Sequence, residues 1–594
     1  MTVLDGKRPN IVAYICSRER PSDAQSAKIR DFIARENDAE VSVVWEEHRE
    51  IGDGFRIEFG EDGRRDKVYD WTLAGKSRKL KADISTALKG RRNVMPLIRQ
   101  AVGGWEPEPV ADEIGTVISV GDGIAVVDGL GSAGYGEILL FDSGIRGMAL
   151  DLREDDIGCV LFGDSSEVKE GSTVLRSGRV AGMPVGEAYI GRAVNALGEP
   201  IDGKGSIAEE DWYLIESPAP AIIDRKPVSR PLETGLLAVD SMFPIGRGQR
   251  ELIIGDRQTG KTALAVDTIL NQKGRGVICI YAAIGQKGSS VAQLADVLAK
   301  RGAMDYTVIV SSTASEAATM QYITPYAACA LGEYFMRRGK DVLIVYDDLS
   351  KHAVAYRALS LLLGRSPGRE AYPGDVFYLH SRLLERSAQL ADRLGGGSMT
   401  ALPIVETQAG DVSAYIPTNI ISITDGQLFL ESDLFHSGQR PAVNIGLSVS
   451  RVGGAAQAPA MKKAAGSIRL DLAQYREIEV FTQFASDLDE LTKRQLRYGH
   501  GLMQLLRQPQ YHPMSQHDQV ITLVSALHHV MQDVPLDDMG RFHTELIKYA
   551  EENMSDVCRR VDTTGQLSDS DREEILKVAK EFLEKYKAEN PQNA

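Results

Sequence analysis

The sequence is poor in cysteine and contains no long hydrophobic run. Its five cysteines lie far apart in the 594 residues, and no two of them form a CxxC pair. This spacing argues against a thiolate zinc site and against a disulfide framework. No segment approaches the roughly 18 uninterrupted apolar residues of a membrane-spanning helix. Residues 1–10 also lack the apolar core of a signal peptide. We therefore expect a soluble protein in a reducing compartment, with no direct membrane span.

An excess of positive charge is also missing. The formal net charge is −15, which argues against nucleic acid as a partner. The hydrophobic share of 43% and the charged share of 25% are those of an ordinary folded protein. Glycine is abundant, with 57 residues, as expected for a chain with many tight turns. The length corresponds to roughly three to five domains.

The first 92 residues predict a small α/β extension. Ser22 is placed to cap a helix that has Ile29, Phe32 and Ile33 on one face. Three runs favour strands on either side of this helix: Ile11–Ile15, Val41–Trp45 and Phe55–Phe59. A basic helical pattern follows over Arg78–Leu88, and residues 93–112 form a polar connection or connecting helix.

Three further patterns predict the rest of a multidomain chain. In residues 113–182, short apolar runs alternate with Gly, Asp and Ser turns, which is typical of a small β-barrel. In residues 183–460, apolar strands alternate with helical patterns, as in a doubly wound α/β domain. Residues 461–594 show helical periodicity, for example over Arg541–Arg560, and predict a C-terminal α-helical domain.

The most informative segment is a phosphate-binding motif in the α/β domain. It follows the strand pattern Glu251–Ile254 and precedes a helical pattern. The helix N-terminus supplies free N–H groups and the positive end of a dipole. Lys261 is predicted to reach the β- and γ-phosphates, and the Thr262 hydroxyl to ligate Mg²⁺. The segment matches G-x-x-x-x-G-K-[ST] in full, as Gly255-Asp256-Arg257-Gln258-Thr259-Gly260-Lys261-Thr262.

Two other strands end in residues suited to the same site. The apolar run Val342–Tyr346 leads into Asp347, a carboxylate predicted to hold the hydration shell of Mg²⁺. The run Val277–Ala283 leads to Gln286, where a hydrolytic site needs a carboxylate base. An amide can hydrogen-bond a water molecule, but it does not accept a proton at neutral pH. The sequence thus predicts a site that binds ATP or ADP with Mg²⁺ and turns it over slowly or not at all.

From about residue 93 onwards, the sequence resembles the alpha subunit of F-type ATP synthases. The resemblance implies a β-barrel domain, a P-loop (RecA-like) domain and a helical domain. It implies a ring in which three alpha and three beta subunits alternate around a gamma shaft, on the cytoplasmic face of the cell membrane. In such rings alpha binds Mg–nucleotide without turnover, and beta couples ATP synthesis or hydrolysis to ion transport. The segments that carry the resemblance are residues 255–262, 283–287, 346–351, 367–382 and 441–454.

The same resemblance assigns residues outside the P-loop. Arg451 would be an arginine finger that reaches the site of the neighbouring beta subunit, where a guanidinium stabilises charge on the γ-phosphate. Pro509 stands where the family has glycine, and this proline removes one backbone donor. The adenine pocket would be formed by Phe435, Arg440, Pro441, Gln508 and Gln510.

The extension resembles the C-terminal domain of the ATP synthase delta subunit. The match rests on residues 54–60 and on Val68-Tyr69-Asp70, followed by a basic helix start. Asp53-Gly54 replaces the usual Gly-Gly, and Asp70-Trp71-Thr72 replaces Asp-Gly-Ser. The resemblance implies that a delta-like module, fused to the rest of the chain, contacts the b subunit of the peripheral stalk, and it leaves open whether a separate delta subunit is also a partner. The alternatives are an unrelated α/β decoration and a partly ordered extension.

Two other classes of function remain open at this point. A homo-oligomeric P-loop motor, such as an RNA translocase or a secretion ATPase, needs a catalytic carboxylate where Gln286 stands. The amide and the negative net charge both argue against it. A regulatory nucleotide sensor without a mechanical role is the third class, and in such a protein Arg451 would serve no neighbouring site.

Overall fold

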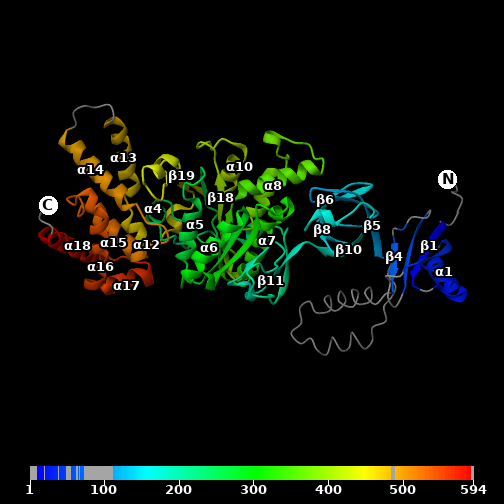
Figure 1. The fold of residues 1–594 in the computed structure, drawn as a ribbon. Coiled ribbons are helices and arrows are strands. Elements are labelled where there is room, and N and C mark those ends of the chain that lie inside the picture. The colour runs from blue at the N-terminus through cyan, green and yellow to red at the C-terminus, as the bar shows by residue number, and fades with distance from the viewer. Residues whose placement is uncertain are drawn as a thin grey trace. The chain divides into compact units, whose positions relative to one another are not determined.

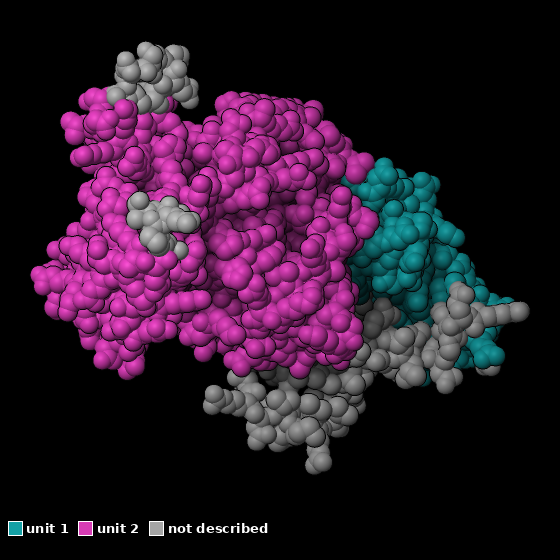
Figure 2. Space-filling model, turned by 60° about the vertical axis from the view of Figure 1, so that its left-hand side comes forward, with its two compact units in different colours: residues 1–181 teal, residues 182–594 magenta. Residues whose placement is uncertain are grey.

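The computed structural model describes residues 10–18, 20–37, 39–48, 55–61, 65, 67–71, 112–482 and 489–589. The helix predicted over Arg78–Leu88 and the connection predicted before residue 112 lie outside these residues. The chain divides into two compact units, Met1–Ala181 and Gly182–Ala594, which Figure 2 colours separately. Each unit is described by itself below.

The first unit begins with a small α/β sheet, as predicted. Its strand β1 (Asn10–Ser17) runs parallel to β2 (Glu40–Glu47), and helix α1 (Asp23–Asn37) connects the two. Two antiparallel strands, β3 (Arg56–Glu61) and β4 (Lys67–Asp70), complete the order β4-β3-β1-β2. The Ser22 cap is confirmed, because the Ser22 hydroxyl accepts from the Gln25 N–H at 3.3 Å while the Gln25 side chain accepts from the Ser22 N–H at 2.8 Å. Ile33 and Phe59 are buried in the core of this sheet.

The predicted β-barrel is also confirmed. Six antiparallel strands follow one another in the order β10-β7-β8-β9-β6-β5, and β10 pairs with β5 to close the barrel. Strand β4 pairs with β5 as well, so the sheet of the extension continues into the barrel. The barrel strands are β5 (Asp112–Gly121), β6 (Ile124–Asp128), β7 (Glu137–Phe141), β8 (Arg146–Leu152), β9 (Asp156–Leu161) and β10 (Thr173–Val180).

The second unit is built on an eight-stranded sheet with the order β12-β16-β15-β17-β18-β14-β19-β20. Figure 1 labels β18 and β19 of this sheet, with helices such as α5 and α7 nearby. Its strands are parallel, apart from β20 at one edge. The three apolar strands named above are confirmed as β14 (Leu252–Gly255), β15 (Val277–Gln286) and β17 (Asp341–Asp347), and β16 (Thr307–Thr313) is a fourth apolar strand beside β15. The other members are β12 (Ala193–Val194), β18 (Ser398–Glu406), β19 (Gly426–Leu430) and β20 (Val449–Ser450). Two further strands, β11 (Gly182–Val185) and β13 (Asp211–Leu214), form a separate two-stranded sheet near the start of this unit.

Helices follow most strands of this sheet, which is the pattern expected of a doubly wound domain. Helix α7 is buried along nearly its whole length, from Thr319 to Met336. The helices are α4 (Leu237–Met242), α5 (Lys261–Leu270), α6 (Gly288–Lys300), α7 (Ala318–Arg337), α8 (Leu349–Leu362), α9 (Val376–Leu384), α10 (Tyr415–Ile423) and α11 (Ser432–His436).

The C-terminal part is helical, as predicted. One expectation needs correction: the pattern over Arg541–Arg560 is not a single helix, because Met554 has an extended φ of −139° between α16 and α17. No helix in the described ranges is long and apolar enough to span a membrane. The helices are α12 (Pro459–Ala464), α13 (Ile468–Thr482), α14 (Glu490–Leu505), α15 (Gln516–Leu527), α16 (Met539–Asn553), α17 (Ser555–Thr564) and α18 (Asp569–Glu589).

Candidate nucleotide-binding site

The predicted phosphate-binding loop joins β14 to α5. A side chain at Gly255 would collide with the carbonyl oxygen of Leu430, so the loop leaves the sheet through a position that only glycine fits. Gln258 and Gly260 have φ values of 62° and 94°, in the left-handed region. The chain thereby curls over the N-terminus of α5, where free N–H groups favour an anion.

Lys261 lies inside this loop. Its side chain is buried, and Nζ donates to the carbonyl oxygens of Gly255 at 2.9 Å and Asp256 at 2.5 Å. Burial lowers the pKa of the ammonium below its ordinary value, while the carboxylates of Glu406, Asp348 and Asp347 oppose that shift. The ammonium is therefore held inside the loop, the position from which the lysine of a P-loop contacts the phosphates of a nucleotide.

Residues from three different elements meet at the Asp347 carboxylate. Thr262, in the first turn of α5, donates its hydroxyl to Oδ2 at 2.8 Å. Gln286, at the end of β15, donates Nε2 to Oδ1 at 2.8 Å and to the Asp347 carbonyl oxygen at 3.3 Å. The structure thus brings together Thr262 and Asp347, which the sequence predicts as metal ligands, and Gln286, which it predicts at the position of a catalytic base.

Tyr281 is a fourth member of this group that sequence reasoning missed. Its hydroxyl donates to Oδ2 of Asp347, and its ring is buried in β15. The local sequence gives no signal for it: Tyr281 lies two residues before Ala283, and Ala283 is placed beside Asp347 only by the register of β15 and β17. That register depends on strand order, which local pattern reasoning does not supply.

The neighbouring carboxylate, Asp348, has a different function. Its side chain caps α8 by accepting from the Lys351 N–H at 2.7 Å. Burial raises its pKa to about 6, although the Lys351 ammonium opposes the shift. Asp348 therefore stabilises the helix that follows the strand, while Asp347 faces Thr262.

Asp256, Arg257 and Thr259 shape the outer part of the loop. The Asp256 carboxylate accepts from the Thr407 hydroxyl at 2.6 Å, from the Gly410 N–H at 2.9 Å and from the Ser432 hydroxyl at 3.1 Å. Burial acts against its charge, but these bonds outweigh burial and lower the pKa of Asp256. Thr259 donates to the Asp256 carbonyl oxygen at 2.8 Å, and the exposed Arg257 pairs with Glu406 at 3.0 Å.

Three of the predicted adenine-pocket residues are held together beside the loop. The Phe435 ring lies next to Gly260, since a Cβ placed on Gly260 would lie 3.6 Å from it. The Arg440 guanidinium lies over that ring, 4.3 Å from its centroid. The backbone N–H of Gln508 donates to the Arg440 carbonyl oxygen at 2.8 Å. Pro441 follows Arg440 directly, whereas Gln510 is exposed beyond Pro509.

Arg451 lies at the edge of the sheet, in the short segment Val449–Arg451, which hydrogen bonds hold in place. It follows β20, and its backbone N–H donates to the Asp425 carbonyl oxygen at 2.8 Å. The Asp425 carboxylate is held by the Arg250 guanidinium, at 2.8 and 3.0 Å. The side chain of Arg451 is exposed. Within the described part of the chain, no hydrogen bond or ion pair joins it to the phosphate-binding loop.

A buried carboxyl group, that of Glu251, lies close to the segment Val449–Arg451. Glu251 is fully buried, and burial raises its pKa well above the ordinary value, while the Arg451 charge acts in the opposite direction. Gln249 donates Nε2 to Glu251 at 2.8 Å and to the Ser450 hydroxyl at 3.2 Å. Gly426 cannot be replaced by a larger residue, because its Cβ would collide with this carboxyl. The strand that precedes Arg451 is therefore tied to the sheet by its pairing with β19 and by the bond from Gln249 to Ser450.

Three family models match the chain. The ATP synthase alpha/beta family matches with its beta-barrel domain over residues 110–178. Its nucleotide-binding domain matches residues 235–450, and the C terminal domain of the alpha/beta chain matches residues 457–582.

This chain matches curated relatives over nearly their whole length. The ATP synthase subunit alpha of Acetivibrio thermocellus is 59% identical over 494 residues, which are 83% of this chain and 98% of that protein. The same subunit of Caldanaerobacter subterraneus is 60% identical over 495 residues, with coverage of 83% and 98%. That of Clostridium botulinum (strain Hall) is 57% identical over 489 residues, with coverage of 82% and 97%. With the barrel, the nucleotide-binding domain and the helical domain all matched, this chain belongs to the family of ATP synthase alpha subunits.

Proposed function

We propose that this chain is the non-catalytic, regulatory alpha subunit in the head of a rotary F-type ATP synthase. The observation that carries the proposal is the contact of the Gln286 amide with the Asp347 carboxylate at 2.8 Å. A hydrolytic site needs a carboxylate base beside the metal, and here an amide donor occupies that position. The site is therefore suited to holding a nucleotide and unsuited to activating water.

The side chains present fit an Mg²⁺ ion together with ATP or ADP. The Thr262 hydroxyl and the Asp347 carboxylate lie 2.8 Å apart and supply the hard oxygen atoms that Mg²⁺ prefers. When bound, the ion would be held by Thr262 and Asp347 and would neutralise negative charge on the phosphates. Lys261 and the N–H groups of residues 255–262 would hold the phosphates, and Phe435, Arg440, Pro441, Gln508 and Gln510 the adenine.

Arg451 is the residue that acts outside this chain's own site. Its exposed side chain, on a segment bonded to Asp425 and, through Ser450, to Gln249, is suited to reaching a neighbouring beta subunit. A guanidinium there would stabilise charge on the transferred phosphoryl group during synthesis or hydrolysis. The partners in this account are alternating beta subunits and a gamma shaft, in a complex peripheral to the cytoplasmic face of the cell membrane.

The extension belongs to the same proposal. Its β-α-β-β-β order and its resemblance to the delta C-terminal domain support a contact with the b subunit of the peripheral stalk. The pairing of β4 with β5 joins the extension to the barrel through backbone hydrogen bonds, as a contact that resists rotation requires. The proposed domains are residues 1–92, 93–112, 113–182, 183–460 and 461–594.

Replacement of Thr262 tests the metal site. We expect Thr262→Ala to weaken Mg–ATP binding by roughly 10- to 100-fold, because a hydroxyl bonded to a charged partner is lost. Thr262→Ser keeps the hydroxyl and should bind as the wild type does. Calorimetric titration with and without Mg²⁺ measures the effect, and the two variants should bind metal-free ATP alike. Equal Mg²⁺ dependence in the alanine and serine variants would remove Thr262 from the metal site.

Replacement of Arg451 tests the arginine finger. We expect Arg451→Ala to lower ATP hydrolysis by the assembled alpha–beta–gamma complex by roughly 10³-fold or more, while nucleotide binding to the isolated chain is unchanged. Arg451→Lys should restore only part of the rate, because an ammonium lacks the bidentate geometry. Arg541→Ala, which removes another exposed arginine, is the matched control. A wild-type rate in the Arg451→Ala complex contradicts the assignment.

Removal of the extension tests the stalk contact. A chain that begins at residue 93 should assemble with beta and gamma but lose binding to the purified b subunit, whereas the full chain binds it. Biolayer interferometry measures the difference, and nucleotide binding by both chains controls for folding. Binding of b to both chains with the same affinity would rule out the extension as the contact.

A further inference from the structure

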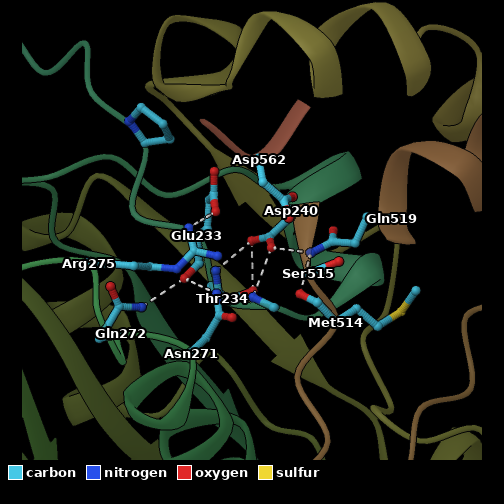
Figure 3. Close-up of polar contacts among 12 residues, drawn as sticks. Glu233, Thr234, Asp240, Asn271, Gln272, Arg275, Met514, Ser515, Gln519 and Asp562 are labelled. Atoms are coloured by element: carbon cyan, nitrogen blue, oxygen red, sulfur yellow. Dashed lines mark hydrogen bonds and ion pairs between the residues drawn. The ribbon is translucent and has the colours of Figure 1, made fainter. Parts of the chain in front are cut away.

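The segment Glu233–Gly235 contacts two parts of the chain that are far apart in the sequence. Figure 3 shows Glu233 and Thr234 close to Asn271 and Gln272 and to Asp240. Asn271 and Gln272, at the end of the helix that begins with Lys261, both donate to the Glu233 carbonyl oxygen at 2.8 Å. The Gly235 carbonyl oxygen accepts from Gln508 Nε2 and from the Met514 N–H, each at 2.8 Å. One short turn therefore holds both the phosphate-binding helix and the loop that carries Gln508.

These contacts fix the orientation of the Gln508 amide. Its Nε2 donates to the carbonyl oxygens of Gly235 and His512, at 2.8 and 2.7 Å. Because both partners are acceptors only, the NH₂ group must face them. Oε1, which accepts from the Leu237 N–H at 3.3 Å, is then the atom left for further donors. Gln508 thus presents a carbonyl oxygen whose direction is set by the turn at Gly235.

The turn itself is held by a buried carboxylate on α4. Asp240 Oδ1 accepts from the Thr234 N–H at 2.9 Å and from the Thr234 hydroxyl at 2.7 Å. Its Oδ2 accepts from the Gly235 N–H at 2.9 Å and from Gln519 Nε2 at 3.0 Å. Burial raises the pKa of Asp240, and the four hydrogen bonds oppose that shift. Four donors around one carboxylate leave the turn little freedom.

The turn also packs tightly against the Gln508 loop. Gly235 has a φ of 73°, and a Cβ there would collide with Pro513 and with the Asn271 side chain. Gln519 belongs to α15, so the same carboxylate connects the turn to the helical part of the chain. A shift of the turn would therefore be transmitted to the loop that follows Gln508.

From this geometry we infer that Asp240 is a positioning residue for the purine of the bound nucleotide. It holds Thr234 and Gly235 so that the Gly235 carbonyl oxygen aligns the side-chain amide of Gln508, whose backbone N–H is bonded to Arg440. It does so through Gln508 and touches no ligand itself. The inference rests on the adenine pocket proposed above, and it adds Asp240 as the residue that holds Gln508 of that pocket in position.

The experiment compares a ligand with a purine and one without. The full chain is titrated with Mg–ATP and with Mg–tripolyphosphate, and the readout is the ratio of the two affinities. We expect Asp240→Asn to lose roughly tenfold in affinity for ATP, which is about the free energy of one hydrogen bond. Its affinity for tripolyphosphate should be unchanged. Thr234→Val, which removes one donor to Asp240, should show a smaller loss of the same kind and serves if Asp240→Asn does not fold.

Asp571→Asn is the matched control. Asp571 is another buried aspartate, whose carboxylate accepts from the Ser568 backbone N–H, just before α18, and from the Arg560 guanidinium. It should lose stability without a change in the affinity ratio, because it contacts no residue of the Gln508 loop in the described ranges. An unchanged ratio in Asp240→Asn, or equal losses for both ligands, overturns the inference. A wild-type chain that does not prefer ATP to tripolyphosphate would instead contradict the adenine pocket itself.

Discussion

A parallel sheet delivers the carboxyl ends of its strands to one edge, and the candidate site depends on that constraint. Strands β14, β15 and β17 end at Gly255, Gln286 and Asp347. Their order in the sheet brings Gln286 and Asp347 within hydrogen-bonding distance. The helix after β14 adds Lys261 and Thr262 from its first turn. Three segments that are separated by tens of residues thereby converge on one carboxylate.

The balance of charge in this group supports the proposal that the site binds nucleotide without turning it over. Lys261 supplies a cation. Burial lowers the pKa of its ammonium, and the neighbouring carboxylates oppose that shift. Asp347 is satisfied by two hydroxyl donors and one amide donor. A glutamate at residue 286 would place a second negative charge beside Asp347, and it would be able to accept a proton from water. Glutamine keeps the geometry and omits the base.

Much of the site follows from local sequence, because the phosphate loop, its strand and its helix are contiguous. Asp347 and Gln286 were also predictable, since each terminates an apolar run. Tyr281 and Asp240 were not, because their partners come from residues that only strand register or tertiary packing brings near. The break at Met554 between α16 and α17 was missed for a related reason: helical periodicity continues across it. The presence of each domain was thus easier to predict than the contacts that hold its parts in place.

The central claim, that this chain binds nucleotide and leaves catalysis to its neighbours, is tested most directly by steady-state Mg–ATP hydrolysis. The purified chain is assayed alone and then with a beta-type and a gamma-type partner, with nucleotide binding measured in parallel. The account predicts that the chain alone binds ATP without measurable turnover, and that hydrolysis begins only when the partners are added. Brisk hydrolysis by the chain alone would contradict the interpretation of Gln286 and would favour a homo-oligomeric motor.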